Sequence, residues 1–569
     1  MAPARPRARR FLGFLRTYIR VGEVGAMRSG MEGARRCKYR ARYYDLEAEE
    51  WREWECDMPA LPGREYCLFH DPEYWREHPE EVRKAFYERV REAMASEGPA
   101  YFIGYHLPEV RLGELGEEVI FRGPVYFNRA VFHKSANFDF VSFFGPTSFE
   151  CVSFFGPAEF NFAGFFGPTS FVDVFFSGPA RFVFTIFSGD TSFECVRFLL
   201  GANFACITVS GRLRFRWCSF PSISEDPLSL VPKRVIFREV AFGERGQILF
   251  EETDMSRVSL LFTDLSQVEF RRVRWWDYGG SFMILDALIL LARTNKGLAR
   301  RYREMARKQI AEFEEALSRG EVPEALERLW HYLRDEIEVS IRREAKSKGQ
   351  DVSYEELFRM AEEVATSKLR GLVSSWARDI DSKELERDED IALENVLQEL
   401  RDLKDWHIAR RRYEEAAKFH IAEMEVRRLA GREEERHVAW PPKGRWRRLK
   451  ERVSAWVERR LLWLYRTTCL YGESLARPVA WLLAIWLLFG LIYALSGLIA
   501  APGLATALQL LAEGLAFSGS VIALMLLFRA APDVAAWSYI AWAEGALALL
   551  IYAVFLPTIM RRIWRLVKA

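Results

Sequence analysis

The sequence predicts a multi-domain β + α protein that combines a stacked β-helix, a charged helical domain and an α-helical membrane domain. Three observations lead to this prediction. Phenylalanine recurs at a fixed interval over residues 127–220, charged helix-forming residues dominate residues 282–440, and residues 478–500 are 23 residues without a charge. A length of 569 residues suits about three or four domains, and a net charge of +2 favours neither nucleic acid nor an acidic partner.

One phenylalanine series has a period of 11 residues, and a second series is offset from it by five. The first series is Phe127, Phe138, Phe149, Phe160, Phe171, Phe182, Phe193, Phe204 and Phe215. The residue two positions earlier alternates between alanine and threonine, as at Ala136 and Thr147, so the true period is 22. Neither one helix nor one strand has this period, whereas a coil that returns above itself after 22 residues does. We therefore expect the phenylalanines to form the structural core of a solenoid.

Gly-Pro pairs recur at the expected corners of the coils, and the spacing becomes a strict five between Phe250 and Trp275. This pattern resembles that of the pentapeptide-repeat family. The resemblance implies a right-handed quadrilateral β-helix with 22-residue coils over residues 115–278.

The N-terminal 100 residues divide into two segments. Residues 1–30 are a basic extension, in which a membrane-touching amphipathic arm and a disordered segment preceding a true start at Met27 are both open. Residues 31–100 combine a Cys-rich, zinc-knuckle-like segment with a charged helix.

The cysteine-rich segment contains four possible metal ligands, namely Cys37, Cys56, Cys67 and His70. Three thiolates and an imidazole complete a tetrahedron around Zn²⁺ and leave no open position, so the predicted zinc is structural. The alternative is three buried reduced cysteines with a surface histidine. The run from Cys67 to Asp71 is similar to the Cys-x-Phe-His-Asp ending found in microbial pentapeptide-repeat membrane proteins. A thiolate site requires a reducing compartment, which predicts a cytoplasmic N-terminus.

Residues 282–440 are predicted to form a charged helical domain. The apolar run Met283–Leu291 is too short to span a bilayer, so we expect a buried helix or a face that docks on the last coils. The segment Arg411–Arg428 is similar to the helix that links repeat and membrane domains in the family, and no chemistry is assigned to it. Trp440-Pro441-Pro442 ends this domain.

Residues 443–569 are predicted to form the membrane domain, with spans at about 478–500 and 537–558 and a re-entrant segment at about 504–528. Residues 443–477 contain ten Lys or Arg against three Glu, and the C-terminal tail is also basic. Both ends should therefore face the cytoplasm, which requires an even number of crossings.

This plan of helix, re-entrant helix and helix is similar to that of two-span potassium channels. A potassium filter needs a Thr-x-Gly-Tyr/Phe-Gly loop, whereas residues 517–529 lack those glycines, so potassium selectivity is not expected. Glu513 and Glu544 are intramembrane carboxylates and candidate pore residues. Alternatively, they lie near the membrane surface or are protonated. The resemblance also implies a homo-oligomer, because a two-span unit forms a pore only with other copies.

No catalytic motif is present, so a non-enzymatic protein is expected. The first hypothesis is a multi-pass cell-membrane protein with both termini cytoplasmic, in which the β-helix binds an unidentified protein and is coupled to a channel-like domain in the lipid bilayer. The alternative is an oligomeric ion channel that is not potassium-selective and is gated by the repeat. A third hypothesis, DNA mimicry as in gyrase-protecting pentapeptide proteins, requires an acidic solenoid. Six acidic against seven basic residues between Phe127 and Phe220 argue against it, and no nucleic-acid partner is expected.

Overall fold

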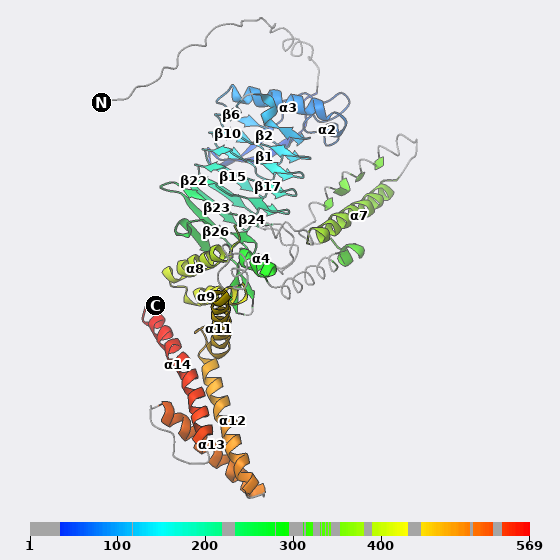
Figure 1. Cartoon of the computed structure of the whole chain (residues 1–569). Coiled ribbons are helices and arrows are strands. Elements are labelled where there is room, and N and C mark those ends of the chain that lie inside the picture. The colour runs from blue at the N-terminus through cyan, green and yellow to red at the C-terminus, as the bar shows by residue number, and fades with distance from the viewer. Residues whose placement is uncertain are drawn as a thin grey trace, which may run out of the picture.

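The structure is a computed structural model. It describes residues 35–116, 118–218, 234–278, 280–294, 311, 314–322, 330–331, 333–335, 337–338, 341–342, 353–380, 390–430, 445–500, 504–526 and 538–568. The predicted basic extension over residues 1–30 lies outside the described residues. From one end of the molecule to the other, an N-terminal cap is followed by a β-solenoid, a group of helices and a pair of long apolar helices with a third packed beside them (Figure 1).

The solenoid has about seven turns and is built from four parallel sheets of eight, five, seven and six strands, so the early turns contribute one strand to every sheet. The first sheet contains β3 (Ala100–Tyr101), β7 (Val125–Tyr126), β11 (Thr147–Ser148), β15 (Thr169–Val172), β19 (Thr191–Glu194), β23 (Arg212–Arg216), β26 (Gln247–Glu251) and β28 (Val268–Arg271). The second contains β4 (His106–Leu107), β8 (Val131–Phe132), β12 (Ser153–Phe154), β16 (Phe175–Phe176) and β20 (Arg197–Phe198). The third contains β5 (Val110–Arg111), β9 (Ala136–Asn137), β13 (Ala158–Glu159), β17 (Ala180–Arg181), β21 (Ala202–Asn203), β24 (Val235–Ile236) and β27 (Val258–Ser259). The fourth contains β6 (Ile120–Phe121), β10 (Ser142–Phe143), β14 (Gly164–Phe165), β18 (Ile186–Phe187), β22 (Thr208–Val209) and β25 (Ala241–Phe242).

The 22-residue period is confirmed by the strand register and by the stacking of the phenylalanine rings. Thr147 pairs with Thr169, and Ala158 pairs with Ala180, so the alternating small residues separate into two sheets. Phe149 and Phe171 stack with centroids 4.7 Å apart and planes 3° from parallel. Rings 11 residues apart instead meet edge to face, as at 88° between Phe149 and Phe160. Both geometries are favourable for aromatic rings, and all nine predicted core phenylalanines are buried.

The Gly-Pro corners are required by close backbone contact between successive turns. A Cβ atom on Gly145 would lie 2.3 Å from the carbonyl oxygen of Gly123 one turn below, and one on Gly167 would lie 2.5 Å from that of Gly145. No other residue fits this column without moving the backbone. Where the sequence spacing becomes a strict five, the turn shortens to 20 residues, because Phe250 pairs with Phe270.

The solenoid begins at Ala100, before the predicted boundary at residue 115. The first turn places Phe102, Leu107 and Leu112 in the interior, so its apolar positions lack the repeated phenylalanine that made later turns recognisable. The right-handed coiling and the quadrilateral cross-section implied by the family resemblance stay predictions.

The N-terminal cap consists of a β-hairpin and two helices. The hairpin strands are β1 (Arg40–Asp45) and β2 (Glu50–Glu55), and the helices are α2 (Tyr74–Glu77) and α3 (Pro79–Met94). Val82, Phe86 and Val90 recur at helical spacing on α3 and are fully buried. The Phe86 ring meets Phe102 of the first turn edge to face at 5.3 Å, so α3 covers the open end of the coil.

The opposite end of the solenoid is covered by α4 (Leu285–Thr294), α8 (Leu393–Ala409) and α9 (Tyr413–Ala430), which follow a short hairpin of β29 (Trp276–Tyr278) and β30 (Ser281–Met283). Trp406 donates through Nε1 to the carbonyl oxygen of Val268 at 2.7 Å, and Phe419 contacts Trp275 edge to face. The apolar run Met283–Leu291 is buried here, in agreement with the docking face expected from the sequence. Helix α7 (Tyr354–Ile380) projects to one side (Figure 1).

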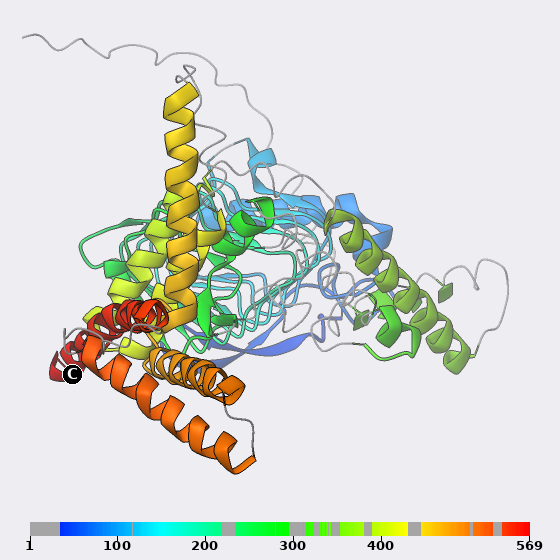
Figure 2. The same cartoon turned by 60° about the horizontal axis from the view of Figure 1, so that its bottom comes forward.

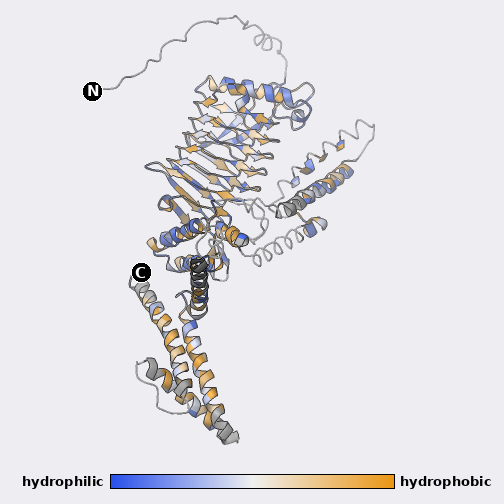
Figure 3. Ribbon diagram, in the orientation of Figure 1, coloured by the Kyte–Doolittle hydropathy of each residue, from blue (hydrophilic) through white to orange (hydrophobic). Residues whose placement is uncertain are grey.

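The C-terminal region is helical, with α11 (Arg445–Cys469), α12 (Ala476–Ala500), α13 (Leu504–Leu526) and α14 (Ser538–Lys568). Ala476–Leu495 and Ile540–Met560 are long and apolar enough to cross a membrane, as the hydropathy colouring in Figure 3 shows. The shorter apolar segment Gln509–Ile522 belongs to α13, which packs on both α12 and α14 (Figure 2). A Cβ atom on Gly514 would lie 2.4 Å from the carbonyl oxygen of Gly490, so the two glycines permit close helix packing.

Candidate functional site

The structure brings the four predicted metal ligands together from three separate parts of the N-terminal cap. Cys37 precedes β1, Cys56 directly follows β2, and Cys67 and His70 lie on the turn before α2. All four side chains are buried, and their ligand atoms lie within 4.8 Å of one another. The hairpin is responsible for the wide spacing between Cys37 and Cys56, because its antiparallel pairing returns the chain to its starting point.

The distances within the cluster fit a tetrahedral metal site. The Cys56 and Cys67 Sγ atoms are 3.8 Å apart, and His70 Nδ1 lies 3.1 Å from Cys67 Sγ and 3.6 Å from Cys37 Sγ. A tetrahedron with metal–sulfur bonds of about 2.3 Å has a sulfur–sulfur edge of about 3.8 Å. The buried Cys₃His cluster could therefore hold a metal ion, and it leaves no position for a substrate.

The orientation of the His70 ring is fixed by the first turn of the solenoid. His70 Nε2 lies 2.8 Å from the carbonyl oxygen of Ile103, and a carbonyl can only accept, so Nε2 carries the proton. Nδ1 is then unprotonated and directed at the thiols, as metal ligation requires. The Tyr39 ring stacks on His70 at 4.0 Å and excludes water from that side.

The thiols differ in acidity even without a metal ion. The hydrogen bond from Cys56 lowers the pKa of Cys67, whereas burial raises the pKa of Cys37. The same hydrogen bond to Cys67, together with burial, raises the pKa of Cys56. The cluster therefore prefers one thiolate when empty, and a cation is needed before the other two thiols can ionise in this buried setting.

The cap is also joined to the solenoid outside the cluster. The His106 amide of β4 donates to the carbonyl oxygen of Phe69 at 2.8 Å, and Tyr126 of β7 donates to Asp45 at 2.9 Å. Asp45 is buried and also pairs with Arg52 of the hairpin at 2.9 Å. The cap is thus attached to the solenoid by contacts that do not involve the metal-ligand side chains.

The two predicted pore residues lie in different environments. Glu544 on α14 is fully buried and accepts hydrogen bonds from Tyr493 of α12, at 2.8 Å, and from Ser518 of α13. Glu513 is exposed on α13. Both of the contacts that hold Glu544 come from its own chain, so Glu544 connects three helices of one copy.

A buried acidic pair at the C-terminal end of the solenoid was missed by the sequence analysis. Asp286 of α4 and Glu399 of α8 hydrogen-bond to each other, and Glu399 accepts from the Leu260 amide at 2.9 Å. Arg238 lies 3.5 Å from Asp286. Burial raises the pKa of Glu399 well above its ordinary value, and the Asp286 charge raises it further. The signal in the sequence was the single Asp286 inside the apolar run Met283–Leu291; nothing marked Glu399.

A second missed site connects the C-terminal cap of the solenoid to the long C-terminal helices. Glu425 of α9 is buried and accepts a hydrogen bond from Tyr471 at 3.2 Å, and it pairs with Arg466 of α11 and with Arg428. Leu470, Tyr471 and Gly472 all have positive φ, which turns the chain sharply between α11 and α12. We refer to these contacts of Glu425 as the joint.

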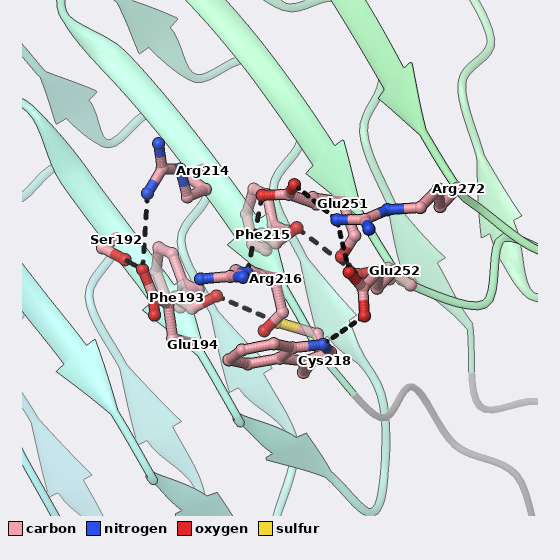
Figure 4. Close-up of polar contacts among 12 residues, drawn as sticks. Ser192, Phe193, Glu194, Arg214, Phe215, Arg216, Cys218, Glu251, Glu252 and Arg272 are labelled. Atoms are coloured by element: carbon pink, nitrogen blue, oxygen red, sulfur yellow. Dashed lines mark hydrogen bonds and ion pairs between the residues drawn. The ribbon is translucent and has the colours of Figure 1, made fainter.

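Charged side chains near the last turns of the solenoid pair with each other, as Figure 4 shows. Arg216 lies 3.5 Å from Glu251, which Arg272 approaches at 3.2 Å from the next turn. Arg214 lies 3.7 Å from Glu194. This surface is a mixed-sign ladder, unlike the uniformly acidic one that DNA mimicry requires.

Comparison of the chain with protein-family models, with curated proteins and with solved structures gave no match in any of the three.

Proposed function

We propose that this protein is a membrane-anchored β-solenoid of the pentapeptide-repeat type, in which a zinc-capped cytoplasmic solenoid serves as a binding module. The observation that carries the proposal is the direct connection between the last turn of the solenoid and two helices long enough to cross a bilayer. Trp406 and Phe419 attach α8 and α9 to the last turn, and Glu425 attaches α9 to the start of the membrane helices.

Zinc is the metal that best suits the N-terminal cluster. Three sulfur ligands and one imidazole are the donor set of structural zinc sites, and hard cations such as Mg²⁺ or Ca²⁺ prefer oxygen. When bound, zinc would hold the hairpin, the turn before α2 and the first turn of the solenoid together. Since Cys37, Cys56 and Cys67 must be reduced to bind it, this end belongs in the cytoplasm.

In the proposed topology both termini are cytoplasmic and α13 is re-entrant. The basic residues before α12 and after Pro557 support this orientation, because Lys and Arg stay on the cytoplasmic side. A re-entrant path for α13 is supported by its packing against α12 and α14. A helix can end at membrane depth when it is buried in protein in this way.

The ion-channel alternative stays a prediction. The hydrogen bonds of Glu544 within one copy explain why a carboxyl group is tolerated among apolar helices, and they do so without a pore. We also propose a non-enzymatic role, and its only basis is that the sequence contains no catalytic motif.

Membrane fractionation tests the proposal. The full chain should stay in the pellet after an alkaline carbonate wash, and single cysteines at positions 503 and 533 should react with a membrane-impermeant maleimide from the same face. A chain that is released by carbonate would contradict membrane anchoring. Labelling of the two positions from opposite faces would contradict the re-entrant path and leave the anchoring intact.

A further inference from the structure

Six large apolar side chains gather on the outer surface of one sheet of the solenoid. Their exposed fractions are 64% for Phe140, 51% for Phe144, 49% for Phe162, 37% for Phe166, 49% for Phe184 and 37% for Ile186. We call this set the aromatic face. It belongs to the fourth sheet and to the corner that precedes it, because β10, β14 and β18 pair in register through Ser142, Gly164 and Ile186.

The rings form two ordered columns. Phe140 stacks on Phe162 at 4.9 Å with planes 1° apart, and Phe162 stacks on Phe184 at 5.0 Å. Phe144 stacks on Phe166 at 4.6 Å. The Phe166 ring also lies flat over the sheet, since a Cβ atom on Gly164 would come within 2.5 Å of it.

The backbone under the first column makes phenylalanine an unexpected choice. Phe140, Phe162 and Phe184 have φ values of 63°, 57° and 58°, in the left-handed region that asparagine, aspartate and glycine tolerate best. A polar residue would suit both this backbone and the solvent. Repetition of exposed phenylalanine here therefore indicates that the surface is covered when the protein functions.

The size of the face suits a macromolecule. An aromatic side chain buries about 150–250 Å², so the six exposed fractions leave on the order of 500 Å² of apolar surface. Each partner in a stable interface contributes about 800 Å². At the N-terminal end the face continues into a pocket of about 400 Å³, which Phe140 and Phe162 line and whose rim carries Glu118 and Asp139.

The outward positions of the sheet under the aromatic face are uncharged, and this points to a second copy of this chain. In a two-fold interface each residue approaches its own equivalent, so a charged residue near the axis would repel itself. The outward positions of β10, β14, β18 and β22 and of the residues after them carry no charge; they are Ser142, Phe144, Gly164, Phe166, Ile186, Ser188, Thr208 and Ser210. The neighbouring sheets carry Arg181 and Glu194 at comparable positions.

We infer that the aromatic face is a homodimer interface in which two solenoids pair side by side and in parallel. The parallel arrangement rests on the proposed membrane anchoring. Two copies in one bilayer are related by an axis normal to the membrane, which keeps every residue at the height of its equivalent. Phe140, Phe162 and Phe184 therefore each meet the same residue of the second copy. Helix α7 leaves the face free, because it projects beyond the opposite edge of the solenoid in Figure 1.

Disulfide cross-linking in native membranes tests the interface directly. The full chain would carry Cys151, Cys195 and Cys206 as serine, together with one new cysteine: Phe140→Cys, Phe162→Cys or Phe184→Cys. Under mild oxidation, all three variants should give a product of twice the monomer mass. Ser153→Cys in β12, on another sheet of the same turn, is the control and should give at least fivefold less.

Three results would overturn the inference. The first is a yield of cross-linked dimer no higher than that of the Ser153→Cys control, and the second is a product of another mass. The third is linkage by Phe162→Cys alone, which would indicate antiparallel pairs. Fractionation of the same samples separates this failure from that of the proposed function, since a released chain would contradict anchoring and a pelleted but unlinked chain would contradict only the interface. A second measurement uses Ile186→Cys as the reporter. Adding Phe162→Ser should lower its linkage at least fivefold without changing the thermal unfolding of the protein.

Discussion

His70 donates through Nε2 to the carbonyl oxygen of Ile103, 2.8 Å away, while its Nδ1 faces three thiols. One imidazole therefore connects the metal cluster to the first turn of the solenoid. Loss of the metal should destabilise the first turn of the solenoid as well as the cap, because the His70 ring both ligates the metal and bonds to that turn.

Removal of zinc should destabilise the N-terminal end of the solenoid first. We expect about one zinc per chain by mass spectrometry of the metal content, and its loss in Cys67→Ser. Because structural zinc contributes folding energy directly, chelation should expose the first turns to hydrogen exchange while the last turns stay protected. Cys195→Ser, at an exposed thiol, is the matched control and should keep the metal. Full zinc content in Cys67→Ser would refute the site.

The stacked core and the exposed corners should differ sharply in their response to truncation. Phe160 is fully buried, whereas Phe262 is 51% exposed at a corner outside the aromatic face. Phe160→Ala should cost about 3–5 kcal/mol, and Phe262→Ala should change the free energy of unfolding by less than about 0.5 kcal/mol. Denaturant unfolding of the detergent-solubilised protein measures both. Equal effects would contradict the stacked-ring core.

Stability at the C-terminal cap should depend on pH through Glu399. Burial and the neighbouring Asp286 raise the pKa of Glu399 in the folded state above its unfolded value, so this state holds an extra proton. The resulting stability is complete below the unfolded pKa, about 4.3, and is lost as pH rises through the raised folded value. Arg238 and Arg234 oppose the shift at Asp286 and moderate the loss.

The variant Glu399→Gln isolates this dependence. Its amide oxygen can still accept from Leu260, and its amide nitrogen can donate to Asp286 as the protonated acid does. We expect the same thermal midpoint as the parent at pH 4 and a higher one at pH 8. Hydrogen exchange in α8 over the same pH range locates the change. A parent protein whose midpoint is independent of pH between 4 and 8 would refute the prediction.

The joint should control how tightly α11 and the helices that follow it are held to the solenoid. Tyr471→Phe removes one hydrogen bond from the buried Glu425 and should cost about 1 kcal/mol, seen as faster hydrogen exchange in α9 and α11. Tyr552→Phe in α14 is a control with the same chemical change. Faster exchange confined to α14, or none in either variant, would mean that the joint does not connect the two parts.

Glu544 should stabilise the packing of α12, α13 and α14, and we expect this role to be larger than any role in ion conduction. Glu544→Gln retains groups that can pair with Tyr493 and Ser518, whereas Glu544→Leu removes both of these hydrogen bonds. The leucine variant should be less stable in detergent by about 1–2 kcal/mol. Ion flux into liposomes tests the alternative: a flux that Glu544→Gln or Glu513→Gln abolishes would favour a channel.

The elements that were predictable are those whose physical cause repeats along the chain. The turn-to-turn stacking of Phe149 on Phe171 follows from a period that the sequence displays many times. The proximity of Cys37, Cys56, Cys67 and His70 was predictable because three cysteines and a histidine are the donor set of a structural zinc site. By contrast, Glu399 and Glu425 look like ordinary charges of solvated helices. They are buried only because α8 and α9 fold back onto the coil, and no local pattern encodes that return.

The 22-residue turn has a further consequence for the reach of this protein. Strands in a parallel sheet are about 4.8 Å apart, so each duplication or deletion of one turn would move the N-terminal cap by that amount relative to the C-terminal helices. Every turn contacts only its neighbours, so such a change would leave both caps intact. The length of the solenoid can therefore change during evolution only by whole turns, each of which adds or removes the same distance.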